Sequence, residues 1–204
     1  SSAGAATLIR HVRDRPQQTL FATAALLRDS LKLHLNAVGM LLVSGAVILI
    51  LQYFRGPAEA AIFQLPLQLF LATMLLPQAA LLVLQGRVAS RGPAEFWREQ
   101  RAIMVVVIAG MTVLAIAFWT LAPFLVRVLG GDEFAGSTKV LQVLAFGLPA
   151  AAFSTLMSIQ WITRGWFWQA SLLTLAMGLF NCSLNFLLIP GFGAVGAAVA
   201  FVLG

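Results

Sequence analysis

The chain has 204 residues, of which 60% are hydrophobic and only 10% charged, and its mean hydropathy is +0.93. A soluble domain carries about 25% charged residues, so this chain lacks the polar side chains that would cover a water-exposed surface. These numbers argue against a soluble enzyme, a coiled coil and a disordered tail. Its apolar runs approach about 20 residues, the length that crosses a bilayer as a helix. The composition predicts an all-α integral membrane protein.

The net charge of +6 comes from thirteen lysines and arginines and seven aspartates and glutamates. The basic residues do not gather in one patch but flank the apolar runs, as is typical of membrane proteins. This distribution argues against a nucleic-acid partner. The single cysteine, Cys182, lies inside an apolar run, where a small packed side chain is the expected role. No set of metal ligands stands out, so we expect neither a metal nor a cofactor.

The chain begins with a basic segment, residues 1–32, in which five lysines and arginines oppose two aspartates. Within it, apolar residues recur at helical spacing over residues 19–32. This pattern predicts a cytoplasmic linker or an amphipathic helix at the membrane surface. Because the chain opens without a methionine and closes at Gly204 within an apolar helical run, we expect it to be part of a longer protein.

Apolar spans joined by short turns with glycine or proline fill the rest of the chain, residues 33–204. We expect these spans at about 33–54, 60–85, 102–129, 138–163, 167–189 and 192–204. The last one would cover only about 20 Å as a helix, which is less than the hydrocarbon core of about 30 Å. The pattern predicts a six-helix lobe whose last helix is truncated.

The distribution of basic residues predicts the orientation of this lobe. Ten of the thirteen lysines and arginines lie in the lead, in the 86–101 loop or at Arg164. The other three, Arg55, Arg127 and Lys139, lie at the opposite ends of the spans. Because cytoplasmic loops carry the excess of lysine and arginine, we expect the lead, the 86–101 loop and Arg164 to be cytoplasmic and the alternate turns to face outward.

The spans lack the groups that an intramembrane enzyme needs. All seven carboxylates lie in the lead, loops or turns, and the two histidines, His11 and His34, lie outside the spans or at an edge. The serines within the spans have no base placed to activate them. We therefore expect no enzymatic activity from this chain.

Uncharged polar residues do form stripes on three of the spans. Gln64, Gln68 and Gln78 fall within about 80° of arc on the 60–85 span, at about 100° per residue. Asn181 and Asn185 share a face of the 167–189 span, and the 138–163 span carries two further glutamines, Gln142 and Gln160, on a narrow face. Such side chains are costly in lipid, so they should face protein or water.

Two interpretations of these stripes remain open. One is a wet cavity that holds a hydroxyl-rich head group, and the other is hydrogen bonding between helices with no ligand. The two are evenly matched for the 60–85 span, whereas bonding between helices is favoured for the two asparagines. Arg55 and Lys139, at the outward ends of spans, would contact an anionic head group or extend to the membrane interface, with the interface favoured.

Three segments stand out in the sequence, at residues 56–65, 129–145 and 181–200. Together they resemble the polysaccharide-transporter flippases, a family that carries O-antigen and other lipid-linked oligosaccharides. The first is 56–65 (GPAEAAIFQL), in which Ala61 replaces the family's usual glycine and Phe63 its usual tyrosine. The second joins 129–135 (LGGDEFA) to 140–145 (VLQVLA). The third joins Asn181 and 185–190 (NFLLIP) to 193–200 (GAVGAAVA), and it is the most specific of the three.

The resemblance covers residues 33–204 and implies the C-terminal lobe of a transporter with twelve or more helices in two lobes. It implies alternating-access translocation of a polyprenyl-pyrophosphate-linked oligosaccharide to the outer leaflet of the bacterial inner membrane, for lipopolysaccharide or other surface polysaccharide. The implied partners are the bilayer, this lipid and an N-terminal lobe of the same chain. A multidrug or peptidoglycan-precursor exporter of the same superfamily, and a membrane scaffold without transport, remain as alternatives.

Overall fold

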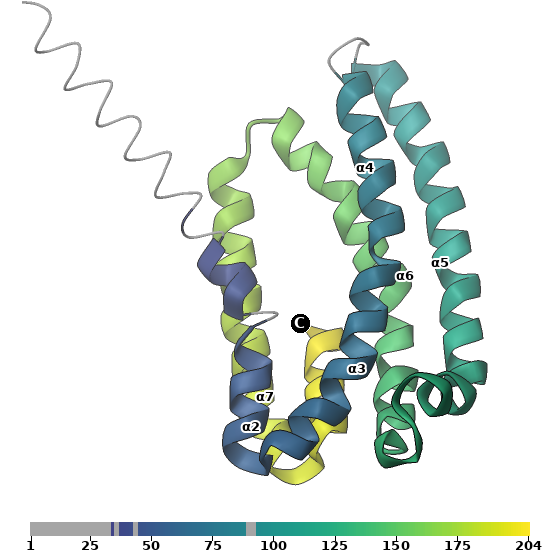
Figure 1. Ribbon diagram of the computed structural model, residues 1–204. Coiled ribbons are helices and arrows are strands. Elements are labelled where there is room, and N and C mark those ends of the chain that lie inside the picture. Colours follow the sequence, from purple (N-terminus) through teal and green to yellow (C-terminus); the bar gives the residue numbers. More distant parts are fainter. Residues whose placement is uncertain (1–33, 35–36, 43–44, 89–92) are drawn as a thin grey trace, which may run out of the picture.

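A computed structural model describes residues 34, 37–42, 45–88 and 93–204 (Figure 1). The basic lead, residues 1–32, lies outside the described residues. The described part is helical and contains no strand. Its elements are α2 (Ala46–Arg55), α3 (Pro57–Thr73), α4 (Leu75–Val88), α5 (Pro93–Gly130), the short 3-10 helix η1 (Asp132–Phe134), α6 (Ser137–Thr163) and α7 (Phe167–Leu203).

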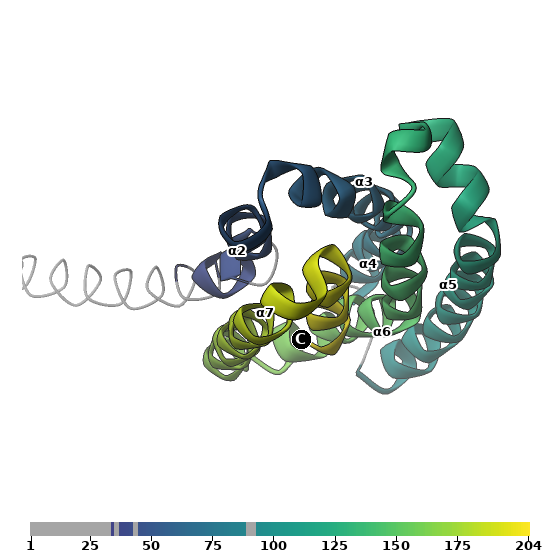
Figure 2. The same ribbon diagram turned by 90° about the horizontal axis from the view of Figure 1, so that it is seen from below.

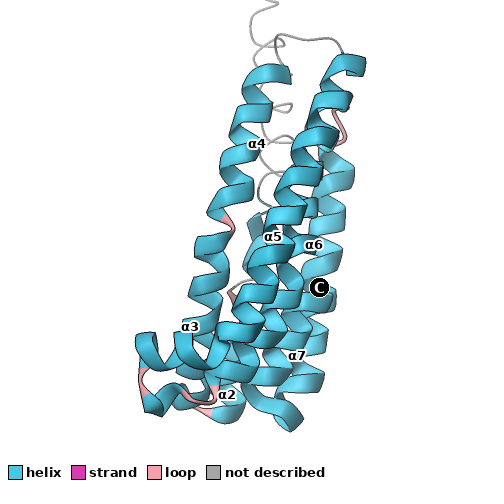
Figure 3. Cartoon of the chain, turned by 90° about the vertical axis from the view of Figure 1, so that its right-hand side faces the viewer, coloured by secondary structure: helices cyan, strands magenta, loops and turns pink. Residues whose placement is uncertain are grey.

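The protein is an all-α, multi-pass membrane protein, as its composition predicts. Five helical segments of the described chain are long and apolar enough to cross a bilayer. They are Ala37–Arg55, Pro57–Arg87, Phe96–Gly130, Ser137–Trp161 and Phe167–Leu203. The second of them combines α3 and α4, which are separated only by a short break at Met74 (Figure 3).

Helix α6 lies at the centre of the packing. It contacts α5, α7, α3 and α4, while α2 packs against α7 (Figures 1 and 2). The largest buried cluster includes Leu51 of α2, Phe63 of α3, Leu144 of α6 and Ile189 of α7. Viewed along the bundle, α5 lies at its outer edge (Figure 2). The core is therefore built from α2, α3, α6 and α7.

Helix α7 folds back on itself at Gly193, whose φ is +57° and ψ −136°. Residues 167–192 form a first limb, and residues 194–203 form a second limb that returns beside it (Figure 1). The two limbs are antiparallel, since the Asn181 amide donates to the carbonyl of Ala200 at 2.8 Å. The sequence places this turn at Pro190–Gly191, but the helix continues past Pro190 and the chain reverses at Gly193.

The predicted orientation can be tested at two exposed positions that lie at opposite ends of the bundle. These are Gly86, near the end of α4, and Ala135, in the turn between α5 and α6 (Figure 1). In a background in which Cys182 is replaced by alanine, we expect Ala135→Cys to react with an impermeant thiol reagent added outside intact cells. Gly86→Cys should react only after the membrane is opened. The reverse labelling pattern would overturn the orientation.

Candidate functional site

Three glutamines are exposed along α3 and α4. Gln64 and Gln68 lie one turn apart on α3, and Gln78 lies near the start of α4. The opposite face of α3 carries Phe63 and Phe70, which are buried in the core. No hydrogen-bond partner for the three amides is found in the described part of the chain. Gln64, Gln68 and Gln78 are called here the glutamine stripe, and they differ in this from the other predicted amides, Gln142, Gln160, Asn181 and Asn185, which are hydrogen-bonded.

The start of α3 follows from its sequence. Gly56 adopts a φ of +87°, which favours glycine, and Pro57 occupies the first position of the helix, where its missing N–H is not needed. Further along, Pro66 leaves the carbonyl of Ile62 without its helical partner. The Ser137 hydroxyl donates to that carbonyl at 2.7 Å. This bond fixes the start of α6 against α3 and holds the stripe-bearing helix in place.

Gln142 likewise bonds α6 to a backbone carbonyl that a proline leaves unpaired, in this case on α5. Pro123 lies inside α5 and leaves the carbonyl of Trp119 without a helical partner. The Gln142 amide donates to this carbonyl at 3.2 Å. An unpaired carbonyl within a membrane is costly, so the Gln142 amide stabilises α5 at Pro123.

Gln160 joins the same two helices nearer the other end of the bundle. Its amide donates to the side-chain oxygen of Gln100, which is fully buried on α5. Gln100 in turn donates to the carbonyl of Leu156 at 2.9 Å. Gln142 and Gln160 therefore make hydrogen bonds between helices, unlike the glutamine stripe, whose amides have no partner in the described part of the chain.

Asn181 and Asn185 are fully buried in α7. Asn181 connects the two limbs of α7 through Ala200, as described above. Asn185 donates to the backbone oxygen of Asn181 at 2.9 Å and to its side-chain oxygen at 2.8 Å. Among the described residues, the Asn185 Oδ1 atom has no hydrogen-bond partner. The structure thus places both asparagines inside the α7 hairpin and away from the glutamine stripe.

Arg55 holds the end of the first limb of α7. Its guanidinium donates to the carbonyl of Ile189 at 3.3 Å and to that of Pro190 at 2.7 Å. A cation at this position also interacts favourably with the C-terminal end of a helix. Lys139, the other predicted head-group contact, is exposed on α6 and forms no ion pair within the described residues.

Glu59 complements Arg55 at the same turn. Its Oε2 atom accepts a hydrogen bond at 2.9 Å from the backbone N–H of Ala194, the first residue of the second limb. A carboxylate at the start of a helix is stabilised by the helix dipole. Arg55 and Glu59, called here the hairpin clamp, thus bind opposite sides of the α7 turn. Arg55 is one of the predicted head-group contacts, whereas Glu59 is absent from the predicted site residues, although 56–65 and 193–200 both belong to the segments that carry the resemblance.

The described residues contain no group of three or more histidine, cysteine, aspartate or glutamate side chains that is suited to hold a metal ion. No family model, curated protein or solved structure matches the chain.

Proposed function

We propose that this chain is one lobe of a transporter that moves a lipid-linked oligosaccharide from the cytoplasmic to the outer leaflet of a bacterial inner membrane. The observation that carries the proposal is the glutamine stripe. Its three amides are exposed on a segment, Pro57–Arg87, that is apolar enough to cross the bilayer. Moving an amide from water into hydrocarbon without a hydrogen-bond partner costs about 4–8 kcal/mol, as measured by transfer to cyclohexane. The stripe should therefore border water, protein or a polar cargo.

The chemistry of the stripe suits a sugar. Each glutamine amide offers two donor hydrogens and an acceptor oxygen, which match the hydroxyl groups of an oligosaccharide. The stripe carries no charge, so it would neither trap nor repel a neutral sugar chain while the cargo moves. The polyprenyl tail would remain in lipid, and only the head group would cross along the stripe.

A second lobe would complete the path, because one face of α3 and α4 cannot enclose a head group by itself. The sequence resemblance supports this arrangement, in which the cavity opens alternately to the two sides of the membrane. The described helices would then act together as one lobe, held by the bonds of Ser137, Gln142 and Gln160 and by the hairpin clamp.

The test is to delete the complete gene and to measure which leaflet holds the lipid-linked oligosaccharide. We expect the lipid to accumulate on the cytoplasmic side and the complete gene to reverse this accumulation. The trapped lipid would then identify the cargo by mass spectrometry. An unchanged distribution in a strain without a redundant transporter would favour a drug exporter, and no change in any exported compound would favour a scaffold.

A further inference from the structure

The start of α5 carries a charged face on an otherwise apolar helix. Arg98 and Arg101 are exposed there, and Trp97 beside them is 44% exposed. At about 100° per residue, these three side chains lie within about 100° of arc. They point away from the core, because the neighbouring Phe96 and Gln100 are buried against the bundle. We call Trp97, Arg98 and Arg101 the α5 basic face.

The positive charge of this face is not neutralised within the described part of the chain. The carboxylate that lies between the two arginines in the sequence, Glu99, forms an ion pair with Arg87 of α4. Arg98 and Arg101 form no ion pair with any described side chain. An arginine at a membrane surface is stabilised by a hydrogen-bonded anion. The two guanidinium groups are therefore available to an anion from outside the described chain.

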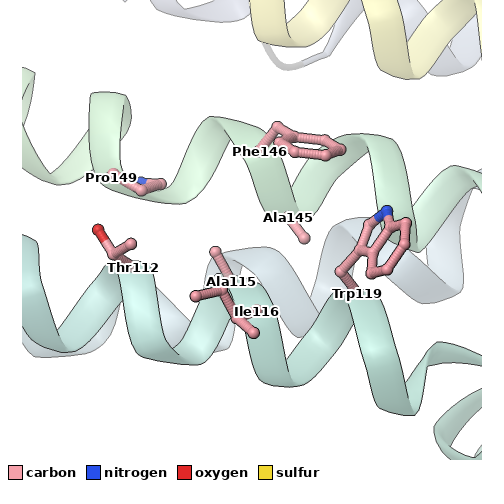
Figure 4. Close-up of a pocket in the computed structure, with 7 residues that line it drawn as sticks. All are labelled: Thr112, Ala115, Ile116, Trp119, Ala145, Phe146 and Pro149. Atoms are coloured by element: carbon pink, nitrogen blue, oxygen red, sulfur yellow. The ribbon is translucent and has the colours of Figure 1, made fainter.

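The basic face lies at the border of the hydrocarbon. No charged residue occurs between Arg101 and Arg127, and this stretch covers about 37 Å as a helix, slightly more than the hydrocarbon core of about 30 Å. One turn beyond Arg101 on the same face, Val105 is 62% exposed. Further along, α5 and α6 border a cavity of about 390 Å³ whose lining has no charged side chain (Figure 4). The arginines therefore lie at the level of the lipid head groups, and Val105 lies in the hydrocarbon below them.

We infer that the α5 basic face binds one anionic phospholipid through its head group. An occupant that meets both the arginines and the exposed Val105 is anionic at one end and apolar at the other, which a phospholipid is and an acidic soluble protein is not. Bulk lipid reaches this face, because α5 lies at the outer edge of the bundle (Figure 2) and only 11% of its apolar stretch is buried, less than in the other four segments.

The chemistry of the face selects the charge of the lipid. A guanidinium forms paired hydrogen bonds with a phosphate, and the indole of Trp97 suits the head-group level of the membrane. A zwitterionic head group brings a cation of its own, which weakens its attraction to Arg98 and Arg101. An anionic head group brings none, so its charge complements the two arginines.

Native mass spectrometry of the complete protein in detergent tests this inference. The protein is titrated with phosphatidylglycerol and, separately, with phosphatidylcholine that has the same acyl chains. We expect the first phosphatidylglycerol to bind about 25-fold more tightly than phosphatidylcholine, which is about fivefold for each arginine. Arg98→Gln/Arg101→Gln should remove this difference and leave the affinity for phosphatidylcholine unchanged.

Arg164→Gln is the matched control for the single variant Arg101→Gln. Arg164 is also exposed and lies at the same end of the bundle, since Gln160 near the end of α6 bonds Gln100 near the start of α5. Its guanidinium, however, lies over the ring of Trp166, 5.1 Å from the centroid. We expect Arg101→Gln to lose about fivefold in phosphatidylglycerol affinity and Arg164→Gln to lose none. The thermal midpoint of each variant shows that it is folded.

Three results would overturn the inference. The first is equal affinity of the unmodified protein for the two phospholipids. The second is an equal loss in Arg101→Gln and Arg164→Gln, which would indicate a general effect of surface charge. The third is displacement of phosphatidylglycerol by undecaprenyl pyrophosphate at lower concentrations than by phosphatidylglycerol itself, which would assign the face to a prenyl pyrophosphate. The inference does not rest on the proposed transport, so its failure would leave that function to its own test.

Discussion

Replacing Gly193 by alanine should strongly destabilise the α7 hairpin. The φ of +57° and ψ of −136° at Gly193 lie in a region that only glycine adopts readily, and a side chain forced into it costs about 1–3 kcal/mol. The added Cβ atom would also lie 2.8 Å from the Glu59 Oε2 atom. It would displace the carboxylate from Ala194, and a hydrogen bond to a charged group contributes about 1.5–3 kcal/mol. Thermal unfolding of the purified protein measures the loss.

Gly191→Ala is the matched control. Gly191 lies two residues away in the same turn, its φ is not positive, and a Cβ atom there would meet nothing within 4 Å. We expect this variant to unfold at the wild-type temperature or slightly above it, because alanine favours the helix over glycine by about 0.8–1.0 kcal/mol. If both variants were equally stable, the hairpin clamp would not stabilise the turn.

The double variant Gln64→Leu/Gln68→Leu should reduce export of the cargo by about tenfold or more. Each lost hydrogen bond contributes about 0.5–1.5 kcal/mol, and about 1.4 kcal/mol corresponds to a factor of ten. Expression and thermal stability should remain normal, since both amides are exposed and have no partner in the described part of the chain. Export is measured by the appearance of the oligosaccharide at the cell surface.

The control for this experiment is Gln52→Leu/Gln169→Leu. Both of these glutamines are also exposed, but Gln52 lies near the end of α2 and Gln169 near the start of α7, outside the glutamine stripe. We expect wild-type export from the control. Normal export in the stripe variant would remove the stripe from the cargo path, and an equal loss in both variants would point to a general effect of added apolar surface.

Fold class could be predicted from the sequence because it depends on local properties. An apolar run of sufficient length must satisfy its own backbone within lipid, and only a helix does so within one segment. The same reasoning locates the turns, since Gly56–Pro57 and Gly131 need no distant partner to interrupt a helix. The turn of α7 was displaced to Gly193 because Glu59, far away in the chain, binds the N–H of Ala194 there.

The roles of the individual polar residues, unlike the fold class, could not be predicted from the sequence. Gln64 and Gln142 have the same side chain and lie in similar apolar spans, so the sequence alone treats them alike. In the fold, Gln142 meets the carbonyl that Pro123 leaves unpaired on another helix, whereas Gln64 meets no partner among the described residues. Likewise, the sequence shows Pro66 but not that Ser137 would bond the freed carbonyl.

The sequence by itself therefore determined that this protein crosses the membrane as helices, and it predicted which side of each helix carries amides. Only the tertiary structure decided which amides bond one helix to another and which have no partner among the described residues. The physical reason is that hydropathy acts on each segment independently, whereas a hydrogen bond between helices requires two groups, distant in the chain, to lie within about 3 Å of each other.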